Sequence, residues 1–316
     1  MAEIFDLVVI GTGSAAISVA LPCRAAGWKV AVVDSRPYGG TCVLRGCDPK
    51  KVLVGAADSV DWTRRMQDKG IDGELTRIDW PALMRFKHTF TDPVPKQREK
   101  TFADAGITTL HGIARFTGPT TLAVDGTQLE ARRIVLATGA KPRPLGIPGG
   151  ELLTISDQFL DLESLPRRIT FLGGGYISLE FAHLALRTGV QVTILHRGTH
   201  VLDGFDPDLI AMLTAEMREM GARVELGVEV KSIEQTSGGL ITRAKRKSGA
   251  DVSVESDIVV HGAGRTPNLQ ELNLQTAGVE SGLRGVAVNE YLQSVSNPAV
   301  YAIGDCAFVL DSITHE

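Results

Sequence analysis

The feature that most constrains the fold is a glycine-rich turn between two apolar runs. The first run ends at Ile10 and is followed by Gly11-Thr12-Gly13, by an alanine-rich stretch up to Gly27, and by a second apolar run that ends at Asp34. This order predicts a strand, a helix and a second, parallel strand. Gly11 permits the tight turn. Gly13 lets a pyrophosphate approach the backbone at the start of the helix, where free N–H groups favour anions.

The same pattern returns in the second half of the chain. Gly173-Gly174-Gly175 follows an apolar run, the next stretch ends at Gly189, and the second apolar run ends at His196. In both copies the first glycine lies 16 residues before the helix-ending glycine and 23 residues before the strand-end residue. One such turn is weak evidence, because many glycine turns bind nothing. Two copies with equal spacing predict two dinucleotide-binding units.

Chain length and the segments around these copies indicate the domain organisation. At 316 residues the chain exceeds one ordinary core, and a proline-rich segment, Lys141–Pro148, separates the two copies. Each copy is followed by alternating strands with turn signals and then by a closing apolar strand. We therefore predict an α/β fold with two tandem Rossmann-like domains, each in three layers with a parallel sheet and a β-meander insertion. The predicted domains are 1–145, 146–268 and a return to the first domain at 269–316.

Composition excludes several other classes of protein. Hydrophobic residues make up 43% and charged residues 22%, which is typical of a soluble globular protein, and the net charge of −4 does not favour a nucleic acid or an anionic membrane as partner. No apolar run is long enough to cross a bilayer. The N-terminus lacks the basic region of a signal peptide, so a cytoplasmic location is expected.

A close pair of cysteines follows the first copy. Cys42 and Cys47 are separated by four residues, a gap that one helical turn closes. Asp48 suits a helix N-cap, which would place Cys47 beside a helix N-terminus that favours the thiolate. No other Cys or His lies at a spacing typical of zinc sites, so no metal site is predicted. A redox-active pair is favoured over two inert thiols, whereas Cys23 and Cys306 are interpreted as packing residues.

Together these features resemble the pyridine nucleotide-disulfide oxidoreductases of the glutathione reductase, dihydrolipoamide dehydrogenase and mercuric reductase type. The resemblance runs from Asp6 to about Phe308. It rests on the two glycine turns, the cysteine pair with its following Pro49-Lys50, and three further motifs: Ala137-Thr138-Gly139, Gly264-Arg265-Thr266-Pro267-Asn268 and Tyr301-Ala302-Ile303-Gly304-Asp305.

The resemblance implies a role for each matching position. Cys47 would be the charge-transfer sulfur that faces the flavin, and Cys42 the interchange sulfur that attacks the substrate. Lys50 would lie near the flavin N5 and pair with Glu180, and Tyr176 would cover the flavin until the nicotinamide displaces it. The residues implied to contact one of the two cofactors are Gly11, Gly13, Ser14, Ala16, Asp34, Ser35, Gly40, Thr41, Lys50, Ile113, Ala137, Thr138, Gly139, Gly173, Gly175, Tyr176, Ile177, Glu180, His196, Arg197, Gly264, Arg265, Gly304 and Asp305.

The implied activity is that of an FAD-dependent NAD(P)H:disulfide oxidoreductase. Hydride would pass from the nicotinamide to FAD, electrons would pass to the Cys42–Cys47 disulfide, and Cys42 would exchange with a small disulfide; oxidation of a dithiol would use the same parts. NAD-specific relatives carry a carboxylate where this chain has His196, which Arg197 follows. Positive groups suit a 2′-phosphate, so NADP is expected in preference to NAD, the alternative being that both side chains are merely solvated.

The chain also departs from the family pattern. Members continue past the Gly304-Asp305 motif into a dimerisation domain, which contributes a His paired with Glu across a homodimer. This sequence ends eleven residues after Asp305, too early for His315-Glu316 to be that pair, so a truncated or naturally short form is expected. Leu44-Arg45 and Asp48 replace the family's usual Asn-Val and Val, which leaves the substrate open.

Two other functions compete with a disulfide reductase. The first is a non-catalytic flavin-binding redox sensor, or an inactive reductase without the His–Glu pair. The second is a thioredoxin reductase-like enzyme. In that group the pair is Cys-x-x-Cys within the nicotinamide domain, and residues 150–268 contain no cysteine.

Overall fold

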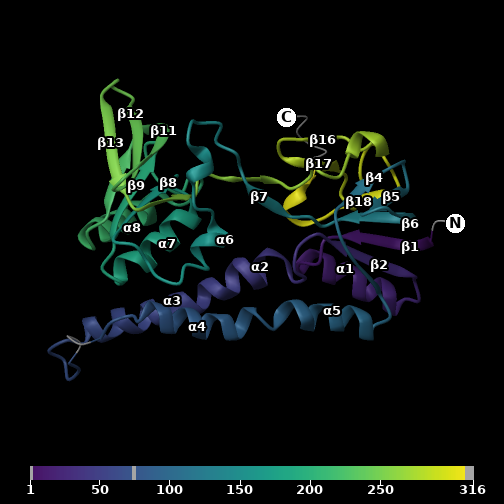
Figure 1. Cartoon of the computed structure of the whole chain (residues 1–316), viewed down its shortest axis with the longest axis horizontal. Helices are drawn as coiled ribbons and strands as arrows, with labels where there is room; N and C mark the ends of the chain where they lie inside the picture. Colours follow the sequence, from purple (N-terminus) through teal and green to yellow (C-terminus); the bar gives the residue numbers. More distant parts are fainter. Residues whose placement is uncertain (1–2, 73–75, 310–316) are drawn as a thin grey trace. The chain divides into compact units, whose positions relative to one another are not determined.

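The computed structural model describes residues 3–72 and 76–309, so His315 and Glu316 lie outside the described residues. The chain divides into two compact units (Figure 1). Unit 1 comprises Met1–Asp48, Phe90–Lys141 and Arg265–Glu316, and unit 2 comprises Pro49–Thr89 and Pro142–Gly264. Pro49–Thr89, expected within the first domain, thus groups with unit 2. Which cofactor each predicted domain binds stays a prediction.

Unit 1 is built on a seven-stranded sheet with the order β3-β2-β1-β6-β5-β4, in which β18 also pairs with β6. The strands β3, β2, β1, β6 and β18 run parallel, whereas β5 pairs antiparallel with the first half of β6 and, on its other side, antiparallel with β4. Figure 1 shows the purple N-terminal strands and yellow β18 in this one unit. The strands are β1 (Glu3–Ile10), β2 (Val30–Asp34), β3 (Thr108–His111), β4 (Ala114–Phe116), β5 (Thr121–Val124), β6 (Thr127–Leu136) and β18 (Val300–Ala302).

Both faces of this sheet are covered, which explains why β1 reads as a continuous apolar run. Leu7 and Val9 pack on the helical side with Ala16 and Ala20 of α1, whereas Val8 and Ile10 belong to the core on the other face. The remaining elements of unit 1 are helices α1 (Ser14–Ala25), α2 (Gly40–Arg45), α5 (Val94–Asp104), η2 (Leu274–Ala277) and η3 (Gly304–Cys306), and a small sheet of β16 (Ser281–Gly282), β17 (Gly285–Val288) and β19 (Ala307–Val309).

Unit 2 repeats this plan. Its parallel sheet has the order β10-β9-β8-β14, and a separate antiparallel meander has the order β11-β12-β13. One core lies on the helical side of the sheet and another beneath the meander. The elements are β8 (Arg168–Leu172), β9 (Gln191–His196), β10 (Arg223–Leu226), β11 (Val228–Thr236), β12 (Gly239–Arg246), β13 (Asp251–Ser256), β14 (Ile258–His261), η1 (Gly150–Leu152), α4 (Trp80–Thr91), α6 (Ser156–Phe159), α7 (Tyr176–Arg187) and α8 (Pro207–Glu219).

These two layered units confirm the predicted α/β fold with Rossmann-like parallel sheets and β-meanders. The chain passes between them at β7 (Ala140–Pro142) and returns at β15 (Arg265–Pro267), and these two strands pair. The boundary also falls within α3 (Cys47–Arg65). Because α3 begins at Cys47, the prediction of an N-cap at Asp48 was wrong. Pro49 is the third residue of this helix and lies in the first turn, where proline is tolerated.

Candidate functional site

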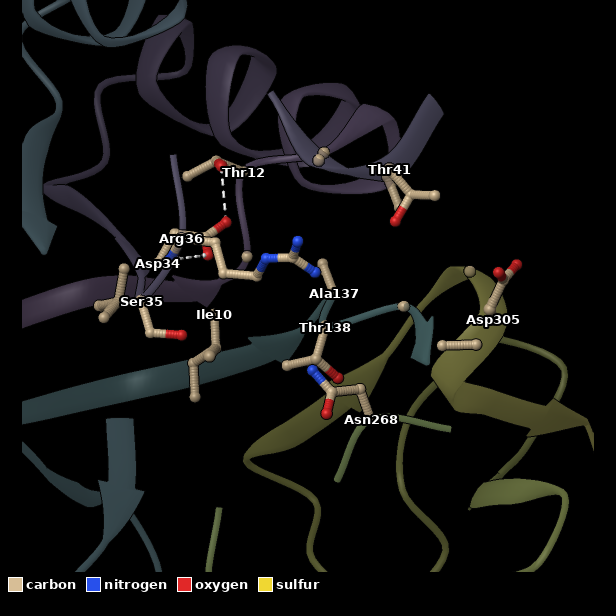
Figure 2. Close-up of a pocket in the computed structure, with 18 of the residues that line it drawn as sticks. Ile10, Thr12, Asp34, Ser35, Arg36, Thr41, Ala137, Thr138, Asn268 and Asp305 are labelled. Carbon is tan, nitrogen blue, oxygen red and sulfur yellow. Dashed lines mark hydrogen bonds between the residues drawn. The ribbon is translucent and has the colours of Figure 1, made fainter. Parts of the chain in front are cut away.

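Unit 1 contains a cavity of about 360 Å³ at the carboxyl ends of its parallel strands (Figure 2). A ligand pocket in this position is typical of open α/β sheets. Thr41 and Asp305 come from separate helical segments, and Thr138 and Asn268 lie across from them in Figure 2. The predicted residues that line it are Gly11, Gly13, Ser14, Asp34, Ser35, Gly40, Thr41, Cys42, Ile113, Ala137, Thr138, Gly139, Gly304 and Asp305. Ala16 is fully buried and packs α1 against the sheet instead.

The floor of the cavity is made by backbones that approach one another closely. Gly11 has a φ of +117°, and a Cβ there would lie 2.3 Å from the carbonyl oxygen of Ala137. A Cβ on Gly40, whose φ is +74°, would lie 2.4 Å from the Cα of Gly13. Side chains are therefore excluded from the turn, as the close approach of a pyrophosphate to the backbone requires.

Asp34 at the end of β2 is held by the protein itself. Thr12 Oγ1 donates to Asp34 Oδ2 at 2.7 Å, and the backbone N–H of Arg36 donates to Oδ1 at 3.0 Å (Figure 2). The N–H of Gly39 donates in turn to Thr12 Oγ1 at 3.2 Å. Each carboxylate oxygen can accept more than one hydrogen bond, so Asp34 keeps acceptor capacity for a ribose hydroxyl.

Thr138 contributes an orphaned polar atom to the cavity wall. Its Oγ1 is buried and has no hydrogen-bond partner among the described residues. A buried hydroxyl without a partner is costly, and a ligand in the cavity would satisfy it. The close backbones, the engaged Asp34 and this hydroxyl together fit the phosphates and riboses of a dinucleotide.

Sequence reasoning missed several polar residues of the cavity. Arg36, Arg45, Lys141, Asn268 and Glu271 also line it. Arg36 extends into the cavity toward Ala137 in Figure 2. Asn268 ends one of the motifs that carried the family resemblance, and that signal would have found it. The other four have no local pattern that marks them.

The predicted cysteine pair is close in space, and its two members differ. Cys42 lines the cavity, whereas Cys47 is exposed, and both are thiols joined by a hydrogen bond. That hydrogen bond raises the pKa of Cys42, and burial and the negative charge of Asp48 act in the same direction. Gly46 allows the close approach, because a Cβ there would lie 2.9 Å from the carbonyl oxygen of Thr41. Which sulfur faces the flavin stays a prediction.

Two ion pairs join α3 and α7 within unit 2. Lys50 Nζ lies 2.5 Å from Glu180 Oε1, so the predicted pair is present, and their side chains are 24% and 37% exposed. Arg187 binds Asp61 at the other end of the two helices and also donates to the carbonyl oxygen of His183 at 3.1 Å. The proposed place of Lys50 beside the flavin stays a prediction.

The second glycine turn also relies on close backbones. Gly173 has a φ of +95°, and its Cβ would lie 2.5 Å from the carbonyl oxygen of Gly262. Gly175 precedes α7, whose first residue, Tyr176, is 57% exposed, while Ile177 is half-buried. On the return to unit 1, Arg265 donates to the carbonyl oxygen of Ala140.

The strand-end residue of unit 2 is engaged with the turn. The N–H of Gly174 donates to His196 Nδ1 at 3.0 Å. Burial lowers the pKa of His196, so the ring favours the neutral form that can accept this bond. Arg197 follows on the exposed surface. The bond to Gly174 leaves Arg197 as the positive group that is available to a ligand at this strand end.

Within residues 3–72 and 76–309, every helix is too short or too polar to span a bilayer. In the same ranges, no three His, Cys, Asp or Glu side chains are grouped so as to hold a metal ion.

Comparisons with known proteins agree with this geometry. A family model described as "Pyridine nucleotide-disulphide oxidoreductase" matches residues 5–315. The glutathione reductase of Burkholderia cepacia is 35% identical over 302 residues, which cover 95% of this chain and 66% of that protein. The mercuric reductase of Lysinibacillus sphaericus is 31% identical over 305 residues, covering 95% and 56%.

The solved structure of the HOCl-induced flavoprotein disulfide reductase RclA from Escherichia coli aligns with a TM-score of 0.82 at 26% identity, covering 95% of this chain and 66% of that one. The chain thus spans between about half and two thirds of the length of these relatives. The match over nearly all of its residues establishes that this chain belongs to the pyridine nucleotide-disulphide oxidoreductase family.

Proposed function

We propose that this chain acts as an FAD-dependent NAD(P)H:disulfide oxidoreductase, with Cys42 and Cys47 as its redox-active pair. The observation that carries the proposal is that Cys42 lines a cavity suited to a dinucleotide while its hydrogen-bonded partner, Cys47, is exposed to solvent. Two neighbouring thiols beside such a cavity can take up electrons from a bound cofactor and pass them to a substrate by disulfide exchange. Proteins of this family bind FAD and a nicotinamide cofactor, and the two glycine turns provide one site for each.

FAD is assigned to unit 1. The glycine turn around Gly11 and Gly13 would hold its pyrophosphate, Asp34 a ribose, and Asp305 its ribityl and phosphate part. When bound, FAD supplies the redox chemistry that links a hydride donor to the two-electron reduction of a disulfide. In Figure 2, Thr41 and Asp305 lie at one end of the cavity and Ser35 at the other, which fits an extended ligand.

The two sulfurs carry out the exchange with substrate. Cys42, as a thiolate, would attack one sulfur of a small disulfide and release the other as a thiolate, which takes up a proton. Cys47 would then attack Cys42, releasing the second substrate thiol and leaving a Cys42–Cys47 disulfide. Each turnover therefore consumes one substrate disulfide, two electrons and two protons. The raised pKa of Cys42 means that its deprotonation needs help from a neighbouring base.

The nicotinamide nucleotide is assigned to unit 2, with NADP preferred over NAD. His196 is bonded to Gly174 and carries no carboxylate to receive a ribose 2′-OH, and Arg197 is exposed beside it. A guanidinium there suits a 2′-phosphate. The further expectations of a cytoplasmic location and of a homodimer for full-length members belong to the same proposal.

An anaerobic titration tests the proposal. The purified chain is titrated with NADPH and, separately, with NADH while the visible absorbance is followed. We expect a yellow protein that takes up two electrons, develops a long-wavelength thiolate-to-flavin band and responds at lower concentrations of NADPH. Cys42→Ser and Cys47→Ser should each abolish disulfide turnover, and loss of the long-wavelength band in only one of them identifies the flavin-facing sulfur. A colourless chain that takes up no FAD contradicts the proposal, and a reducible flavin without disulfide turnover favours the redox sensor.

A further inference from the structure

His261, at the end of β14, is an unusual residue for the interior of a parallel sheet. The residue is only 6% exposed, and both nitrogens of its ring have hydrogen-bond partners. Nε2 lies 2.7 Å from the carbonyl oxygen of Arg143, and Nδ1 accepts from the N–H of Ala263 at 3.0 Å. A ring that donates with one nitrogen and accepts with the other is neutral and has a single tautomer, with its proton on Nε2.

Arg143, in the segment that enters unit 2, makes further hydrogen bonds to the residues that follow His261. Its backbone N–H donates to the carbonyl oxygen of Gly264 at 3.1 Å, and its Nη2 donates to the carbonyl oxygen of Ala263 at 2.6 Å. Three hydrogen bonds thus join Arg143 to residues 261–264, and a fourth, from the Ala263 N–H to the imidazole, holds the ring. We call Arg143 and His261–Gly264 the latch.

The latch lies against the second glycine turn. The Cβ that Gly173 lacks would lie 2.5 Å from the carbonyl oxygen of Gly262 and 2.7 Å from the Cα of Ala263. The N–H of Gly262 donates to the carbonyl oxygen of Leu172, the residue just before the turn, at 2.8 Å. A Cβ on Gly262 would lie 2.0 Å from Ser178 Oγ in the first turn of α7. No side chain separates the two backbones, so a shift of Gly262 or Ala263 displaces the turn directly.

We propose that His261 and Arg143 are positioning residues that set the backbone of the nicotinamide-nucleotide turn at Gly173–Gly175. The proposal rests on the assignment of this turn to the nicotinamide nucleotide. An apolar side chain could fill the space of His261 without burying polar atoms. Packing alone therefore does not explain why a histidine occupies this position. What the imidazole adds is a fixed distance between the carbonyl of Arg143 and the N–H of Ala263.

Three substitutions of His261 separate its two hydrogen bonds. His261→Asn keeps an acceptor near the position of Nδ1, His261→Gln keeps a donor near the position of Nε2, and His261→Leu removes both. Binding of NADP⁺ and of NAD⁺ is measured by calorimetry on the oxidised, FAD-loaded chain, together with FAD content and thermal stability. Thr214→Val is the matched control, since Thr214 is another buried polar residue of unit 2, and among the described residues its hydroxyl bonds within α8 alone, to the carbonyl oxygen of Ile210.

His261→Leu should weaken NADP⁺ binding roughly tenfold, because neither hydrogen bond of the imidazole then holds the latch. His261→Asn and His261→Gln should each recover part of that loss. FAD content should not change, since the cavity lies in unit 1. Arg143→Met, which removes the bond to Ala263, should weaken NADP⁺ binding less than His261→Leu. Thr214→Val should lower thermal stability with unchanged NADP⁺ affinity.

The outcomes distinguish the two proposals. If the wild-type chain binds neither NADP⁺ nor NAD⁺, the proposed function fails and the positioning role falls with it. If the wild-type chain binds NADP⁺ and His261→Leu binds it equally well, only the positioning role is overturned. If His261→Leu does not fold, the Asn and Gln variants decide, and equal wild-type affinity in both of them overturns the positioning role.

Discussion

The two glycine turns share one backbone plan and differ in how the strand-end side chain is engaged. In unit 1, Thr12 Oγ1 donates to the carboxylate of Asp34; in unit 2, the backbone N–H of Gly174 donates to the imidazole of His196. Both bonds connect residues 22 positions apart, from the middle of the turn to the end of the second strand. The repeated fold therefore joins the middle of the turn to the end of the second strand in both units, through a carboxylate in unit 1 and through a neutral ring in unit 2.

The largest expected effect comes from adding one methyl group to either turn. Gly11→Ala should abolish FAD retention and leave nicotinamide binding, and Gly173→Ala should do the reverse. Each Cβ would lie within 2.5 Å of a carbonyl oxygen, at a φ that L-residues rarely adopt. We expect roughly hundredfold weaker binding at the altered site. FAD absorbance after gel filtration and NADP⁺ calorimetry measure the two sites separately.

Matched controls exist in both copies. Gly27 and Gly189 end the corresponding helices with φ values of +90° and +85°, and a Cβ there meets open space among the described residues. Gly27→Ala and Gly189→Ala should therefore cost stability through backbone strain with little change in affinity at either site. If either control removes a cofactor as fully as its partner in the turn, the close backbone contact is not the cause.

The next effect concerns which nicotinamide nucleotide unit 2 prefers. His196→Glu should make unit 2 resemble unit 1 by providing a carboxylate for a ribose 2′-OH, and Arg197→Met should remove the charge assigned to the 2′-phosphate. The double variant should shift the ratio of NADPH to NADH affinity by roughly tenfold or more toward NADH, since charged hydrogen bonds are the strongest of their kind. Stopped-flow reduction of the flavin by each nucleotide measures the ratio. An unchanged ratio of affinities would show that Arg197 does not contact the 2′-phosphate.

A smaller effect is expected at Thr12. Thr12→Val keeps the shape of the side chain but removes the donor to Asp34 and the acceptor for the Gly39 N–H. FAD binding should weaken roughly fivefold, because Asp34 is then less firmly oriented and one backbone N–H loses its partner. Thr12→Ser, which keeps the hydroxyl, should bind FAD nearly as well as the wild-type chain. Fluorescence of released flavin during dilution follows the change.

The smallest effect is a dependence on pH confined to unit 2. Burial lowers the pKa of His196 below its ordinary value of 6.5, with Asp203 opposing and Arg197 assisting the shift; the ring also accepts from Gly174 only when neutral. The unfolded chain takes up this proton first as the pH falls, so the stability gained from neutral His196 is complete above 6.5 and is lost on acidification through the lower, folded-state pKa. Imidazole nitrogen NMR should show His196 titrating below 6.5 as the Nε2–H tautomer. A value above 6.5 contradicts this account.

The sequence predicted those parts of the fold that depend on short stretches of neighbouring residues. Gly11 and Gly173 have positive φ values of +117° and +95°, which residues other than glycine rarely adopt. A glycine at each of these positions therefore indicates a tight turn, and the two turns predict the two strand–helix–strand units. The pairing of Lys50 with Glu180 was implied by the family resemblance and not by any pattern of their own.

Contacts set by the tertiary fold could not be predicted in this way. Asn268 lies 130 residues after Thr138, and both line the same cavity only because the chain returns to unit 1 after completing unit 2. The bond between His196 and Gly174 likewise depends on ring orientation, which no spacing encodes. The role proposed for His261 could not be predicted from the sequence, because an isolated histidine in an apolar strand belongs to no recognisable motif.

The unequal surroundings of the two thiols have a practical consequence. Cys47 is open to solvent, whereas Cys42 is half-buried and its hydrogen bond to Cys47 raises its pKa. A brief exposure of the reduced chain to an alkylating agent should therefore modify Cys47 first, and capping that sulfur leaves Cys42 unable to close a disulfide. Peptide mass mapping after such a pulse thus reports the oxidation state of the pair without any knowledge of the physiological substrate.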